Sequence, residues 1–142
     1  MARGMQIAAS VLMLLIGGLT YLLFRPTTLV LFQLVRLMGL EDAVMRWREE
    51  VAGARMPEFV VYCLPNGLWA AAYVLLIHAL LMGKPAKTRL LAVAVIPLIG
   101  AGAEAMQAFG FLPGTYDNGD MACLLAPLAA YAAFIYKQHD NN

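Results

Sequence analysis

Four long apolar stretches divide this chain, and short segments between them carry most of the charge. The stretches cover residues 5–24, 58–82, 89–111 and 118–137. A helix needs about 20 predominantly apolar residues to cross the hydrocarbon core of a bilayer. The pattern therefore predicts an all-α membrane protein, a single membrane domain over residues 1–142, with four transmembrane helices.

The segment between the first and second stretches has a different pattern. Residues 27–40 are apolar but too short to span comfortably. In residues 41–55, Val44, Trp47 and Val51 share one helical face, and charged residues occupy the others. We expect interfacial or re-entrant helices over about 27–55, which either lie on the bilayer or form a docking surface for a partner.

The first stretch follows a short basic start at Arg3, as the apolar region of a signal peptide would. It is longer than a typical signal-peptide region, and no A-x-A-like cleavage site closes it. Arg25-Pro26 then ends the helix, because proline disfavours helix in the residue before it. We predict an uncleaved first spanning helix.

Composition supports a membrane location. The chain is 62% hydrophobic and 13% charged, with a mean hydropathy of +0.71, whereas soluble domains carry about 25% charged residues. A net charge of +1 gives no basic field for nucleic acid, so the lipid bilayer is the expected partner. Cys63 and Cys123 are far apart without metal-ligand spacing, and His78 has no acidic neighbour. We expect these three side chains to pack, and we expect no metal and no cofactor.

The positions of Lys and Arg bear on orientation. With four spans, five basic residues lie on each side of the membrane, so the count alone does not decide. The compact loop containing Lys84, Lys87 and Arg89 is the clearest short-loop signal. It favours a topology with both termini in the cytoplasm.

Polar and aromatic residues recur inside the second stretch. Their spacing of four, four, three and four predicts that they share one helical face: Glu58, Tyr62, Asn66, Trp69 and Tyr73. Pro65 and Gly67 weaken the helix there. The alternative is an aromatic belt at the interface with a simple kink, although Asn66 and Tyr73 lie deeper than a belt requires.

The third stretch contains a carboxylate inside an apolar run. Glu104 lies about six residues inside that run and shares a helical face with Gln107. A charge at a helix centre costs about 2.5–3.5 kcal/mol to insert, so such a residue is a functional candidate by default. We expect Glu104 to face the bundle, to be protonated or to be paired.

Two more carboxylates stand where the fourth stretch begins. Asp117 or Asn118 caps this helix in the simplest interpretation, which does not account for Asp120 or for Glu104. The start of the second span, the end of the third and the start of the fourth lie at one membrane face. The polar residues expected to gather there are Tyr62, Asn66, Glu104, Gln107, Asp117 and Asp120.

These residues resemble a motif of the VanZ-like family of small multi-pass membrane proteins. The matching pattern is Glu104-x-x-Gln107, then Pro113-Gly114, then Asp117-x-x-Asp120. A weaker match covers residues 64–69, and the resemblance extends over about residues 58–135. It implies a bacterial inner (plasma) membrane protein from a family named for an association with glycopeptide-antibiotic resistance.

The chain departs from the family pattern at two places. Gly114 and Thr115 stand where many members of the family have an arginine. Leu124 and Pro127 stand near positions where many members have asparagine and glycine. The resemblance therefore does not imply a buried arginine–carboxylate pair here.

Three functional hypotheses follow. The first is a non-catalytic binding protein whose outward-facing cluster takes a polar headgroup or an antibiotic-like ligand, with Glu104, Asp117 and Asp120 as acceptors. Gln107, Asn66 and Tyr62 would orient that ligand. The second is a structural or accessory subunit of a larger membrane complex, or a homo-oligomer. Small residues at helical spacing favour it: Ala122, Ala126, Ala129 and Ala133.

The third hypothesis is an enzyme that acts on a lipid. Three carboxylates can hold a hard cation, or one can act as a general base. No His, Ser or Lys joins the cluster in the sequence pattern, and no basic group awaits a phosphate. The pattern therefore favours a non-enzymatic role, with no catalytic residue assigned.

Overall fold

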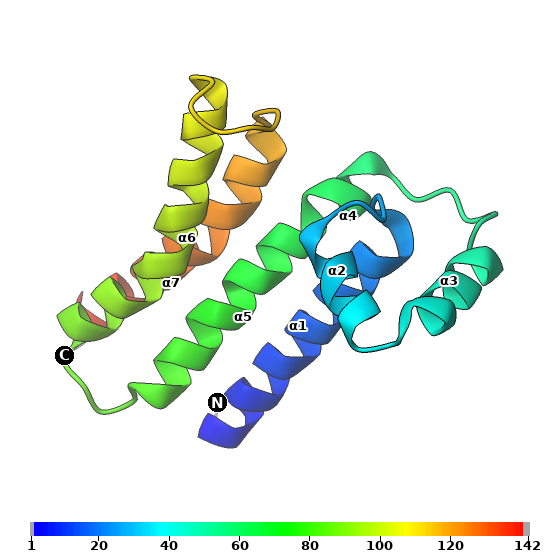
Figure 1. The fold of residues 1–142 in the computed structure, drawn as a ribbon. Coiled ribbons are helices and arrows are strands. Elements are labelled where there is room, and N and C mark those ends of the chain that lie inside the picture. The colour runs from blue at the N-terminus through cyan, green and yellow to red at the C-terminus, as the bar shows by residue number, and fades with distance from the viewer. Residues whose placement is uncertain (1, 141–142) are drawn as a thin grey trace.

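The computed structural model describes residues 2–140, and within this range the regular structure is entirely helical (Figure 1). The helices in order are α1 (Arg3–Phe24), α2 (Val30–Leu37), α3 (Glu41–Glu50), α4 (Glu58–Tyr62), α5 (Leu64–Leu80), α6 (Ala86–Ala108) and α7 (Asn118–Asp140). The all-helical prediction is confirmed.

Helices α1 and α6 and the segment Asn118–Lys137 of α7 are long and apolar enough to cross a membrane. Their mean hydropathies over the most apolar window are 2.3, 1.7 and 1.4. Helix α5 is apolar but has only 17 residues, about 26 Å of helix. Three of the four predicted spans are therefore matched by such helices, and the span over residues 58–82 stays a prediction.

The second apolar stretch is interrupted at Cys63, between α4 and α5. Pro65 falls in the first turn of α5, where its missing N–H costs no intrahelical hydrogen bond. Hydrogen bonds continue on both sides of the interruption, from Cys63 N to Phe59 O at 3.0 Å and from Gly67 N to Cys63 O at 3.1 Å. The helix is therefore weakened where the sequence predicted, by a short break at which the helical path continues.

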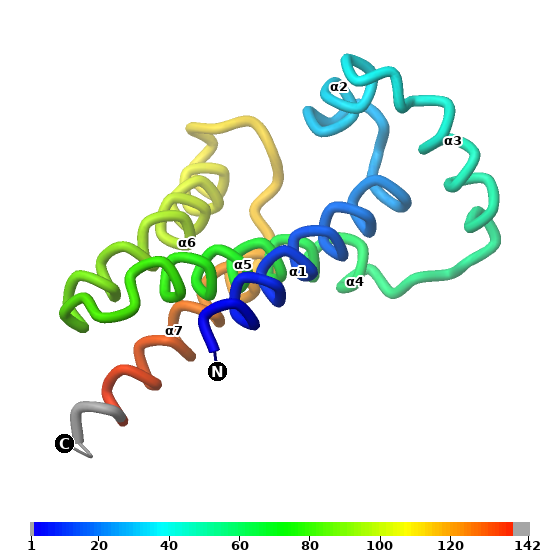
Figure 2. The backbone as a smooth tube through the Cα atoms, turned by 90° about the horizontal axis from the view of Figure 1, so that it is seen from below, coloured from blue at the N-terminus to red at the C-terminus, as the bar shows by residue number. Residues whose placement is uncertain are grey.

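Helix α5 lies in the middle of the molecule, between α1 on one side and the α6–α7 hairpin on the other (Figures 1 and 2). The buried residues of α1 are Gln6, Ser10 and Gly17, which share one face. Ser10 satisfies its hydroxyl by donating to Gln6 O at 2.8 Å. Small residues on this face let the two helix backbones approach closely.

The hairpin side of α5 packs through Val74, Val93 of α6 and Tyr131 of α7. Gly100 of α6 makes room for Leu124 of α7, since a Cβ there would lie 3.1 Å from Leu124 Cδ2. Pro97 is fully buried inside α6. Leu124, which departs from the family pattern, is therefore a packing residue between α6 and α7.

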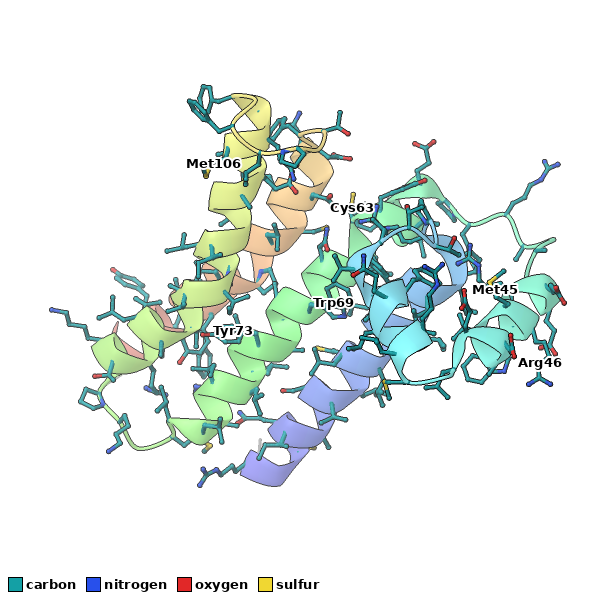
Figure 3. The ribbon with its side chains drawn as sticks, in the orientation of Figure 1. Met45, Arg46, Cys63, Trp69, Tyr73 and Met106 are labelled. Carbon is teal, nitrogen blue, oxygen red and sulfur yellow. The ribbon has the colours of Figure 1, made fainter. Side chains whose placement is uncertain are left out.

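Trp69 and Tyr73 lie four residues apart on α5, but they contact different neighbouring helices (Figure 3). Trp69 packs against α1, with its ring centroid 5.4 Å from that of Tyr21. Tyr73 instead faces α6 and donates its hydroxyl to Ala92 O at 2.8 Å. A helix with neighbours on both sides divides such a stripe between them, and sequence spacing does not say where each neighbour lies.

Helices α2 and α3 form an arm beside the end of α1 (Figure 2). Phe32 and Val35 of α2 pack on Val44 of α3 in a small core of their own. Trp47 remains half exposed, as expected for a residue at a membrane boundary. The arm occupies the segment for which interfacial helices were predicted.

Candidate functional site

The turn between α6 and α7 begins where Gly110 adopts a φ of 73°. Phe111 N donates to Met106 O at 2.9 Å and Gly110 N to Gln107 O at 3.0 Å, which is the Schellman pattern that ends a helix. The expectation that the third stretch stays helical to 111 is wrong, since α6 ends at Ala108. Glu104 is therefore in the last turn, about 6 Å from the helix end and shallower than predicted.

Asp117 caps α7, as predicted. Its Oδ1 accepts a hydrogen bond from Gly119 N at 2.6 Å, and its carbonyl accepts from Met121 N at 3.1 Å. An aspartate at this position satisfies a backbone donor that the first turn of a helix leaves free. Tyr116 donates to Asn118 Oδ1 at 2.7 Å, so Asn118 belongs to the same turn.

The turn brings Glu104 to this cap. Asp117 N donates to Glu104 Oε2 at 3.4 Å, so the Glu104 carboxylate lies against the backbone of the capping residue across the hairpin. The Gln107 side chain lies against Gly114, where an added Cβ would be 2.7 Å from Nε2. Gly114 has a φ of 134°, so both its backbone and its surroundings require glycine. The structure thus joins both halves of the sequence motif.

Asp120 lies in the first turn of α7 and close to the break between α4 and α5. Its Oδ1 is buried and has no hydrogen-bond partner among the described residues. The Asp120 carboxylate lies within hydrogen-bonding range of the Cys63 thiol and close to the Cys123 thiol. A Cβ at Gly119 would lie 2.6 Å from Cys63 Sγ, so α7 begins almost in contact with this break, where Figure 3 marks Cys63.

The two cysteines are part of this site, which sequence reasoning missed. Both are free thiols, and Cys63 is buried. A Cβ at Gly67 would lie 3.3 Å from Cys123 Cβ, so α5 and α7 are close at the second cysteine too. The sequence positions of the cysteines could have indicated this, because Cys63 directly follows Tyr62 and Cys123 is three residues after Asp120.

Tyr62 and Asn66 were expected to orient a ligand, but neither is shown in contact with the three carboxylates. The Tyr62 ring lies 4.9 Å from the guanidinium carbon of Arg25, at the end of α1. Asn66 is partly buried in the first turns of α5. We therefore define the carboxylate cluster as Glu104, Asp117 and Asp120, with Gln107, Cys63 and Cys123 around it.

The chemistry of the cluster is that of a hydrogen-bond acceptor. Carboxylate oxygens form their strongest hydrogen bonds with cationic donors such as ammonium groups. Among the described side chains, residues 2–137, no group of three or more His, Cys, Asp and Glu is arranged to hold a metal ion. The arrangement suits recognition of a donor-rich polar group at the end of the bundle.

Comparison of the chain with protein-family models, with curated protein sequences and with solved structures found no match. The resemblance to the VanZ-like family therefore depends on the motif across the α6–α7 turn.

Proposed function

We propose that this chain is a non-catalytic, multi-pass protein of the VanZ-like type in a bacterial inner membrane. Its carboxylate cluster faces outward and binds a polar headgroup or an antibiotic-like ligand that carries an ammonium group. Both termini are cytoplasmic in this proposal. The family resemblance supports the location in a bacterial envelope, and the carboxylate cluster supports the chemistry of the ligand.

The buried, unpaired Oδ1 of Asp120 carries this proposal. A buried acceptor without a donor costs about 1–3 kcal/mol, and more when it is charged. Glu104 and Asp117 lie across the same turn and add negative charge. A ligand ammonium would supply the missing donor, which gives binding a clear source of free energy.

Four spans follow if α4 and α5 cross the membrane together. Residues 58–80 would extend about 34 Å as a continuous helix, against a hydrocarbon core of about 30 Å. The α5–α6 loop with Lys84, and Lys87 at the start of α6, then lie at the opposite membrane face from the carboxylate cluster. In this proposal that loop, the clearest short basic signal, is cytoplasmic, and the carboxylate cluster is therefore outside.

We test the proposal with purified protein in nanodiscs that contain equal amounts of phosphatidylethanolamine and phosphatidylcholine. The ethanolamine ammonium donates hydrogen bonds, whereas the choline ammonium has no N–H. Native mass spectrometry should show preferential retention of the ethanolamine lipid. Asp120→Asn and Glu104→Gln should each weaken that retention by about tenfold, because a hydrogen bond to a charged group contributes roughly 1.5–3 kcal/mol.

Glu50→Gln is the matched control, since Glu50 is exposed on α3. It should retain the wild-type preference. In cells that express the chain, tolerance of a glycopeptide antibiotic should rise, and the same two cluster variants should abolish the rise at unchanged protein level. Wild-type protein that shows neither a headgroup preference nor any change in tolerance would refute the proposal.

A second function, as an accessory subunit, is favoured by the outer face of α7. All four alanines of its small-residue stripe are exposed in the single chain: Ala122, Ala126, Ala129 and Ala133. The packing of α7 within the chain uses other residues, including Leu124 and Tyr131. Exposed small residues allow a further transmembrane helix to approach closely.

Ala126→Leu combined with Ala129→Leu should therefore abolish co-purification of a partner, or of a second copy, in mild detergent. The added side chains keep the helix backbones apart and leave the internal contacts of α7 unchanged. Ala8→Leu is the control, because Ala8 is exposed on α1 outside the stripe. Native mass spectrometry of the purified protein shows whether a partner or a second copy is bound. A wild-type chain that purifies alone would count against the subunit role.

A further inference from the structure

A second polar site lies at the other end of the molecule, in a cavity of about 360 Å³ between α1, α5 and α7. Gln6 lines it from α1, Leu75 and His78 from α5, and Tyr131 and Phe134 from α7. His78 is 15 residues beyond Cys63, about 22 Å along the helix direction. The cavity is therefore independent of the carboxylate cluster and of the function proposed for it.

Gln6 presents an unused acceptor here. The residue is 8% exposed, and its Oε1 is buried without a hydrogen-bond partner among the described residues. Buried side-chain amides are normally paired, so an orphaned oxygen on a cavity wall calls for a donor in the cavity. The surrounding walls are mostly apolar, and neither of their two polar side chains, His78 and Tyr131, forms a hydrogen bond with this oxygen.

His78 presents a donor on the same cavity. Its Nδ1 lies 3.0 Å from the Tyr131 hydroxyl and 3.5 Å from Arg89 Nη1. Arginine is always a donor, so Nδ1 is the acceptor of this cluster and the ring proton resides on Nε2. His78 and Tyr131 are 8% and 7% exposed, and Phe134 packs edge-on against the imidazole at 6.1 Å between ring centroids. The ring is thus held rigidly.

We propose that this cavity binds a neutral membrane lipid with a free hydroxyl group, such as a monoacylglycerol. The hydroxyl donates to Gln6 Oε1 and accepts from His78 Nε2–H, and the acyl chain lies along the apolar walls. Pockets for small ligands start at about 300 Å³, so the volume suits a hydroxyl with the first part of a chain.

Charge decides between lipid classes. Among the described side chains, residues 2–137, no charged one lines the cavity, and the guanidinium of Arg89 contacts His78 Nδ1 at 3.5 Å without lining it. Burying an ionised headgroup without a partner is costly, whereas a hydroxyl needs only one donor and one acceptor. Gln6 is three residues from the start of α1 and His78 two from the end of α5, so the polar groups are near the membrane surface. A lipid would therefore keep its head at its normal depth.

The test uses the full-length protein in phosphatidylcholine nanodiscs doped with 1-oleoylglycerol or, separately, with methyl oleate. The two probes share the acyl chain, but only the first has a hydroxyl donor. Native mass spectrometry should show about tenfold stronger retention of 1-oleoylglycerol. Gln6→Leu should remove this difference, and Gln33→Leu, at an exposed glutamine of α2, should preserve it.

Ala130→Trp places an indole in the cavity while keeping both Gln6 and His78, and it should reduce retention of both probes. Ala129→Trp, at the neighbouring exposed position, should leave both unchanged. Asp120→Asn should retain 1-oleoylglycerol like the wild type, which separates this site from the carboxylate cluster. Equal retention of the two probes, a Gln6→Leu variant that binds like the wild type, or a cavity occupied by a second copy of the chain would each overturn the proposal.

Discussion

Gly17→Leu is expected to force α1 away from α5 and to lower the free energy of unfolding by about 3 kcal/mol, the upper end of the usual cost of overpacking. A Cβ at this position would lie 2.7 Å from Trp69 Nε1 and 3.3 Å from Pro65 O. The indole can move, but the backbone oxygen cannot move without shifting the start of α5. A larger side chain therefore separates the two helices.

The chain supplies a matched control at the next position. A Cβ at Gly18 meets nothing within 4 Å, and the residue belongs to the same turn of α1. Gly18→Leu makes the same change in hydrophobicity and helix propensity without a collision. Unfolding measured by steric trapping in bicelles should show a loss for Gly17→Leu alone. Equal stabilities of the two variants would mean that α1 does not pack on α5 as described.

The long helices were predictable because membrane insertion imposes a length and a composition that are read directly from the sequence. The ends of the helices were harder to predict. The third stretch remains apolar through Phe111, yet Gly110 ends the helix earlier with a left-handed backbone conformation. Hydropathy does not reveal such a residue, whereas a glycine followed by Phe-Leu-Pro-Gly does indicate the end of a helix.

The part of the site carried by the α6–α7 turn was predictable for a local reason. Glu104 and Asp117 are joined by one short turn, so the helical hairpin brings them together. Tyr62 and Trp69 depend instead on where α1 lies, and this is decided by small residues such as Gly17. Ser10 and Gly17 carried a usable signal, as small residues on one face of an otherwise bulky helix.

Arg48→Met is expected to release the α2–α3 arm from the end of α1. The carbonyl of Leu22 has no intrahelical donor, because the residue four positions later is Pro26, which lacks an N–H. Arg48 Nη1 supplies the donor, at 2.6 Å to Leu22 O and 3.0 Å to Arg25 O. Its guanidinium carbon also lies 5.5 Å from the Phe32 ring centroid, so one side chain joins α1, α2 and α3.

Methionine keeps the length and apolar character of this side chain but provides no donor or charge. A hydrogen bond to a charged group contributes about 1.5–3 kcal/mol, so local opening of α3 should become at least about tenfold more frequent. Hydrogen exchange of the Glu41–Glu50 amides in nanodiscs measures this directly. Arg46→Met is the control, since the hydrogen bond of Arg46 within the described part of the chain stays inside α3, to Asp42 O at 3.4 Å. Unchanged exchange in Arg48→Met would mean that burial of Phe32, Val35 and Val44 alone fixes the arm. Faster exchange confined to this variant would show that the proline which ends α1 also creates the attachment point for α3.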